Sequence, residues 1–81
     1  MENETGREMT YGEKAVGLTF NPGGHEKVNE VKKAFAKAID SIQEERAKDI
    51  TPSEKGAMLT LAIRKAQDAQ MWAVKAITWK D

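Results

Sequence analysis

The spacing of hydrophobic residues predicts a long amphipathic helix in the middle of the chain. From about Glu26 to about Lys48, apolar residues recur at alternating intervals of three and four, as one face of an α-helix requires. Lysine and glutamate fill most of the other positions, so the opposite face is expected to meet solvent. The predicted apolar stripe consists of Val28, Val31, Phe35, Ala38 and Ile42, widened by Ile39.

A second long helix is predicted from Pro52 nearly to the C-terminus. Thr51 is the expected N-cap, Pro52 the first helical residue and Glu54 the reciprocal partner of a capping box. Two long helices joined by a short link predict an antiparallel helical hairpin. The apolar stripe of the second helix is expected to consist of Met58, Leu61, Ala62, Ala69, Trp72, Ala76 and Trp79.

A short helix is expected ahead of the hairpin, from Tyr11 to Leu18. Thr10 and Glu13 have the spacing of a capping box at its start. The segment Asn-Pro-Gly-Gly at residues 21–24 then interrupts helical structure, because proline restricts the residue before it and glycine permits positive φ. The chain is therefore predicted to be all-α, with a short helix, a loop of defined shape and a long hairpin.

The length of 81 residues allows one small domain, in which residues 1–9 are expected to form a flexible tail. A chain of this mass buries only about 60% of its unfolded surface, so a monomer would be marginally stable. The sequence holds no cysteine and a single histidine, which excludes disulfides and multi-histidine metal sites. Oligomerisation remains as the source of added stability.

The C-terminal stretch at residues 69–79, AQMWAVKAITW, supports this expectation of a homo-oligomer. Its apolar side chains fall on nearly every side of a helix, whereas one partner helix covers only one side. Further subunits are therefore expected to pack around it. The expected interface residues are Met71, Trp72, Val74, Ile77 and Trp79.

Charge and motif content narrow the possible functions. Thirteen basic residues balance thirteen acidic ones, which argues against a general nucleic-acid coat. No apolar run is long enough to cross a bilayer and the N-terminus lacks an apolar signal region, so a cytoplasmic protein is expected. The sequence shows no arrangement typical of a nucleophilic triad, a metalloprotease or a phosphate-binding loop. Neither an enzyme nor a cofactor is expected.

The N-terminal third nevertheless carries a set of residues suited to a nucleotide. Tyr11 offers an aromatic face, Lys14 and Lys27 offer positive charge, and the loop at residues 21–24 offers backbone N–H groups near the start of a helix. An aromatic face, a cation and a helix N-terminus together can bind a base and a phosphate. A tyrosine at a helix start can equally be a packing residue.

Two segments carry a resemblance to a known family. TYGEKAVGLTFNP at residues 10–22 and AQMWAVKAITW at residues 69–79 resemble the signature stretches of phage anti-CBASS cyclic-oligonucleotide sponges, whose hairpin domain recurs in Thoeris anti-defence sponges. The resemblance implies a homohexamer that captures host cyclic dinucleotides such as cyclic GMP-AMP without cleaving them. It also implies separate pockets for cyclic trinucleotides.

The resemblance assigns candidate roles to the binding residues. A cyclic dinucleotide is pseudo-two-fold, so two chains would each present one Tyr11 face to a base and one Lys27 charge to a phosphate, with Lys14 nearby. The trinucleotide pocket would use the loop of Asn21, Pro22, Gly23 and Gly24 together with Arg64. Because Gly23 and Gly24 bring no hydroxyl donor for a phosphate, this second pocket is expected to be weakened or lost.

Two other functions remain open from the sequence. A helical interaction module would bind a host protein through the tryptophan-rich C-terminal face and would show no affinity for nucleotides. A DNA-binding accessory protein would need a basic stripe, which this neutral sequence does not display clearly. Measurement of the native mass and a titration with cyclic GMP-AMP would separate these functions from a sponge.

Overall fold

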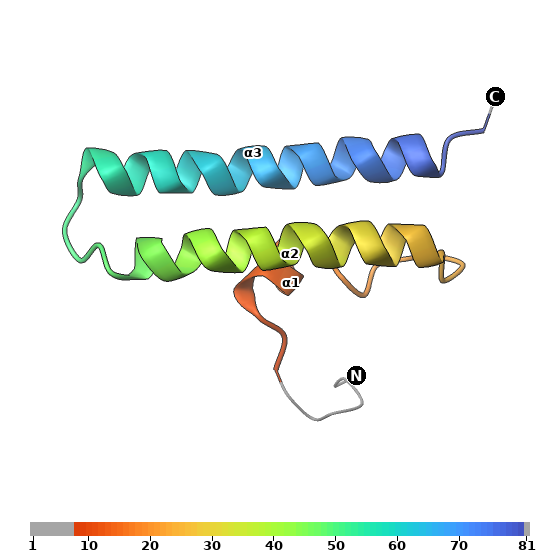
Figure 1. Cartoon of the computed structure of the whole chain (residues 1–81), viewed down its shortest axis with the longest axis horizontal. Coiled ribbons are helices and arrows are strands. Elements are labelled where there is room, and N and C mark those ends of the chain that lie inside the picture. The colour runs from red at the N-terminus through yellow and green to blue at the C-terminus, as the bar shows by residue number, and fades with distance from the viewer. Residues whose placement is uncertain (1–7, 81) are drawn as a thin grey trace.

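The computed structural model describes residues 8–80 and shows three helices. These are α1 (Tyr11–Ala15), α2 (Glu26–Ala47) and α3 (Glu54–Ile77), and this part of the chain contains no strand. Helices α2 and α3 lie side by side and antiparallel, and α1 packs against the middle of α2 (Figure 1). The predicted all-α hairpin with a short leading helix is confirmed. Residues 1–7, most of the predicted flexible tail, lie outside the described residues.

Helix α1 begins as predicted and ends earlier. The Thr10 hydroxyl accepts a hydrogen bond from the Glu13 N–H, and the Glu13 carboxylate accepts one from the Thr10 N–H, each at 3.0 Å. Gly17 adopts a left-handed φ of 60°. The N–H of Gly17 then bonds to the Lys14 carbonyl, and that of Leu18 to the Glu13 carbonyl, which is a Schellman motif. This glycine cap shortens the expected helix of residues 11–18 to five residues.

The predicted loop at residues 21–24 has a defined shape that the Asn21 side chain fixes. Its amide oxygen accepts from the His25 N–H at 3.2 Å, and its amide nitrogen donates to the His25 carbonyl at 2.9 Å. Gly23 and Gly24 both have positive φ, as the prediction of a glycine turn requires. Helix α2 follows directly and ends within one residue of its predicted end.

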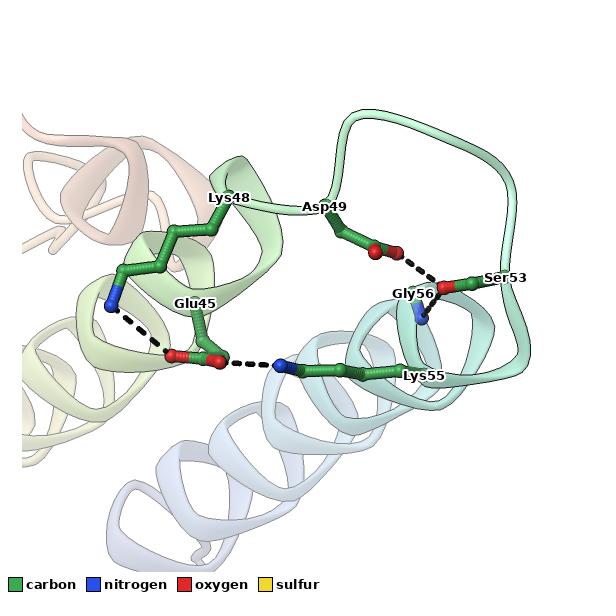
Figure 2. Close-up of polar contacts among 6 residues, drawn as sticks. All are labelled: Glu45, Lys48, Asp49, Ser53, Lys55 and Gly56. Atoms are coloured by element: carbon green, nitrogen blue, oxygen red, sulfur yellow. Dashed lines mark hydrogen bonds and ion pairs between the residues drawn. The ribbon is translucent and has the colours of Figure 1, made fainter.

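The predicted start of α3 is wrong by two residues. The N-cap is Ser53, not Thr51, and the helix begins at Glu54, so Pro52 lies in the link. The Ser53 hydroxyl accepts from the Gly56 N–H at 3.0 Å and donates to the Asp49 carboxylate at 2.5 Å (Figure 2). Asp49 lies in the link just after α2, four residues before Ser53, so a contact within the link favours Ser53 as the cap.

A small core forms where all three elements meet. It consists of Val16 from the end of α1, Ala36 and Ile39 from α2, and Ile63 from α3. Partly buried hydrophobic residues surround it: Ala15, Leu18, Phe35, Ile42 and Ala66. The predicted stripe of α2 therefore faces the core in large part, although Ala38 is exposed.

The predicted stripe of α3 is on the wrong face for contact with α2. An α-helix turns by about 100° per residue, so Trp72 lies on the opposite side of α3 from the buried Ile63. In the single chain Trp72 is 63% exposed, and its companions on this outer face are also exposed. The outer stripe of α3 comprises Met58, Leu61, Ala62, Ala69, Trp72 and Ala76, and it is continued by Trp79 just beyond the end of the helix.

Candidate ligand-binding site

Tyr11, the candidate base-stacking residue, is the first residue of α1 and is held by Arg46. The Tyr11 hydroxyl accepts a hydrogen bond from Arg46 Nη2 at 3.1 Å. The guanidinium carbon of Arg46 also lies 5.4 Å from the centroid of the Tyr11 ring, within the range of a cation–π contact. The contacts with Arg46 fix the position of Tyr11, and because the residue remains 40% exposed, part of its surface stays open to a ligand.

The backbone of α1 is fastened to α2 beside this tyrosine. The Gly12 N–H donates to Asp40 Oδ1 at 2.6 Å. A Cβ at Gly12 would overlap the Ala36 carbonyl oxygen, so only glycine permits this approach. The close contact sets the place of Tyr11 relative to the hairpin.

The two candidate lysines lie apart from one another. Lys14 is exposed on α1 and borders a hollow of about 590 Å³ whose lining also includes Phe20, Lys32 and Lys75. Lys27 is exposed in the first turn of α2, where it forms a 3.4 Å ion pair with Glu30.

Within one chain, the structure does not bring Lys27 to Tyr11. A rise of about 1.5 Å per residue places Lys27 roughly 28 Å along the α2 axis from Arg46, which contacts Tyr11. A pocket that contains both Tyr11 and Lys27 therefore has to be built from two chains.

The loop at residues 21–24 and Arg64 also lie apart. The loop borders a hollow of about 340 Å³ that Val74 of α3 and its C-cap Thr78 line from the other side. Arg64 is exposed and donates to Gln67 at 3.0 Å, roughly 15 Å along α3 from Val74. A trinucleotide pocket with both features likewise requires more than one chain.

Lys32 is a residue of this region that the sequence reasoning missed. It is buried, and its ammonium donates to the carbonyls of Gly17 and Phe20 at 2.9 and 2.5 Å. Burial lowers the pKa of this ammonium. The spacing of four from Val28 and from Ala36 already places Lys32 on the buried face of α2. That spacing could have identified it.

Arg46 was also missed, and no local pattern would have found it. Thirty-five positions along the chain separate it from Tyr11, and in the sequence it directly follows Glu44 and Glu45, two carboxylates typical of a solvated face. Only the packing of α1 onto the hairpin brings the two side chains together.

A comparison with protein families decides where the chain belongs. The family model of the Acb2/Tad1 hairpin domain matches residues 13–78, which include all of α2 and α3. The chain belongs to the Acb2/Tad1 hairpin family. Membership confirms the resemblance found in the sequence, and the Acb2/Tad1 family implies a phage anti-defence sponge for cyclic nucleotides. Searches of curated proteins and of solved structures returned no match.

Two further properties of this Acb2/Tad1 hairpin concern metals and membranes. Among residues 8–80, no three histidine, cysteine or acidic side chains gather as a metal site would require. Within the same range, no helix has the length and apolar character needed to cross a bilayer.

Proposed function

We propose that this protein is a phage anti-defence sponge that acts in the cytoplasm of the infected host cell. It binds cyclic dinucleotides such as cyclic GMP-AMP and holds them uncleaved, which withholds them from the CBASS effector. The observation that carries the proposal is Tyr11, an aromatic residue held beside a cation in a chain of the Acb2/Tad1 hairpin family. Stacking and charge contacts bind a ligand without breaking a bond.

The dinucleotide pocket lies between two chains. Tyr11 of one chain and Lys27 of another supply the aromatic face and the charge, because the two are distant within one chain. A two-fold pair of chains then offers each half of the ligand the same contacts, and Lys14 adds positive charge beside Tyr11.

The outer stripe of α3 supports assembly, and we propose a homohexamer. Trp72 and Trp79 of this stripe, and Met71 beside it, are each at least 60% exposed in the single chain, and exposed large apolar side chains that gather on a surface normally mark an interface. Val74 and Ile77 are half-buried on the side of α3 that faces the hairpin, so they extend the interface only at their edges.

Cyclic trinucleotides bind at a second kind of pocket. Three copies of the loop at residues 21–24, each with Arg64 from a neighbouring chain, match a three-fold ligand. The loop contributes backbone N–H groups and Arg64 contributes a planar, charged donor. Arg64 is exposed and bonded only to a neutral amide in the described contacts, so its charge is available to a phosphate.

The test is calorimetry of two variants with both classes of ligand. Tyr11→Ala should lose roughly 1–3 kcal/mol for each stacked base. Because a two-fold ligand meets two copies of Tyr11, cyclic dinucleotide affinity should fall by about two or more orders of magnitude. Arg64→Ala should weaken only cyclic trinucleotides. Tyr11→Phe is the matched control, because it keeps the ring and should retain most of the affinity.

Equal losses for both ligands in either assembled variant would show a single shared pocket. Ligand released by heat from the wild-type complex should be intact, and linear products would indicate a phosphodiesterase instead. The alternative function, capture of a host protein by the tryptophan-rich face of α3, rests on the exposed Trp72 and Trp79. It predicts no heat of binding with any cyclic nucleotide.

A further inference from the structure

Arg46 occupies a junction between all three helices. Its Nε donates to Gln43 on α2 at 2.9 Å, its Nη1 to the Thr60 hydroxyl on α3 at 3.0 Å, and its Nη2 to Tyr11 on α1 at 3.1 Å. Each contact uses a different nitrogen of the planar guanidinium, so the group has one orientation. A lysine ammonium has its three N–H donors on one nitrogen, so it could not span these three partners as the guanidinium does.

We propose that Arg46 has two roles at the Tyr11 site: it holds the Tyr11 ring in position for stacking on a base, and it binds a phosphate of the same ligand. This inference rests on the proposed function. The sequence assigned the charge beside Tyr11 to lysines, and the structure places an arginine against the ring itself. Arg46 thereby becomes a ligand-binding residue that a single chain contributes together with Tyr11.

Arg46 has N–H groups that its contacts within the chain do not use. A guanidinium carries five N–H groups, and the three contacts to Gln43, Thr60 and Tyr11 use three of them. Arg46 is only half-buried, and it borders a hollow of about 410 Å³ beside the link between α2 and α3. Tyr11 does not line that hollow, and the Asp49 carboxylate there remains negative although it accepts from Ser53, so the hollow is not the place of the phosphate. The two unused N–H groups and the partial exposure of Arg46 instead leave a phosphate able to bind it from the side of Tyr11.

The rigid placement of the ring has a direct effect on binding. A free tyrosine side chain would have to be ordered when the base stacks on it, and that ordering weakens affinity. In this protein the hydrogen bond and the cation–π contact order Tyr11 before the ligand arrives. Loss of Arg46 should therefore weaken binding even when the tyrosine remains.

The experiment measures the affinity of cyclic GMP-AMP for Arg46→Gln and Arg46→Lys by calorimetry. Arg46→Gln should lose about tenfold or more, as expected for removal of a charge-assisted hydrogen bond. Arg46→Lys keeps the charge and the aliphatic stem, so it should fold and show a smaller loss. Lys48→Gln is the matched control, because it removes one exposed positive charge from the same end of α2 without contact to Tyr11, and it should bind like wild type.

A second readout reports the position of the ring without any ligand. Tyr11 is the only tyrosine of the chain, so fluorotyrosine labelling gives one ¹⁹F resonance. This resonance should shift in both Arg46 variants and stay in place in Lys48→Gln. Wild-type affinity in a folded Arg46→Gln, with loss in Tyr11→Ala, would overturn the role of Arg46 alone. Wild-type affinity in Tyr11→Ala would overturn the proposed function and this inference together.

Discussion

At the scale of single residues, Gly12 decides whether α1 can rest on α2. Its N–H reaches Asp40 Oδ1 at 2.6 Å because no side chain separates the two backbones. The atom that a Cβ at this position would meet first is a backbone oxygen of α2, which cannot swing away as a flexible side chain would. The position of Tyr11, one residue earlier, depends on this contact.

Gly12→Ala should destabilise the protein by about 1–3 kcal/mol, the usual cost of forcing extra volume into a packed contact. Helix propensity alone predicts the opposite sign, since alanine is the better helix former. Urea unfolding followed by circular dichroism measures the difference. Asp40→Ala should also lose stability, and Asp40→Asn should lose less because it retains an acceptor oxygen. An alanine variant as stable as wild type would contradict the close approach.

At the scale of elements, the end of α2 is tied to the start of α3 by ion pairs on the hairpin surface. Glu45 accepts from Lys55 at 2.6 Å and from Lys48 at 3.5 Å (Figure 2). The contacts with Lys55 and then Lys48 lower the pKa of the Glu45 carboxyl, and Glu45 raises the pKa of the Lys55 ammonium. These groups are exposed, so their contribution to stability is small and is screened by salt.

The lowered pKa of Glu45 predicts the direction of a pH effect. Its contribution is present above the ordinary glutamate pKa of 4.5 and is lost as pH falls through the lowered value in the folded protein. At low salt, wild type should therefore have a higher melting temperature than Glu45→Gln near neutral pH, and this difference should disappear in acid. Glu44→Gln removes a neighbouring carboxylate outside these ion pairs and is the control. A difference in melting temperature that grows in acid would refute the stabilising role of the Glu45 ion pairs.

The elements that the sequence predicts correctly are those that local chemistry determines. The capping box of Thr10 and Glu13, the glycine loop and the bounds of α2 depend on residues a few positions apart. The start of α3 was wrong although it too is local: the N-cap is Ser53, held by Asp49 four residues earlier, whereas the capping-box spacing of Thr51 and Glu54 favoured Thr51. For the site, the sequence identified Tyr11 but not Arg46, since only tertiary packing joins them.

At the scale of the whole molecule, α3 has two apolar sides and α2 covers one of them. Ile63 is buried against the core, while Met58, Leu61 and Trp72 are more than half exposed on the outer stripe of α3. Apolar residues therefore recur at helical spacing on both sides of α3, and the sequence alone could not show which side meets α2. A second copy of the chain is the occupant that we propose for the outer side.

Trp72→Ala should dissociate the assembly and leave the fold of the chain in place. In one chain the indole contacts Lys75 and is mostly exposed, so its loss removes little from the core. If another chain buries it, truncation costs about 3–5 kcal/mol for each copy. Sedimentation velocity should show a smaller particle, whereas Ile50→Ala, at a 91% exposed residue of the hairpin link, should sediment like wild type. A monodisperse wild-type monomer at micromolar concentration would exclude the proposed hexamer.

The distance between Tyr11 and Lys27 has a consequence for how capture depends on the amount of protein. Because each chain supplies only part of the proposed dinucleotide pocket, ligand binding and subunit association are thermodynamically linked. Linkage is reciprocal, so a captured dinucleotide favours association by the same factor by which association favours capture. A sponge built in this way holds its ligand weakly while its chains are scarce and more tightly as they accumulate.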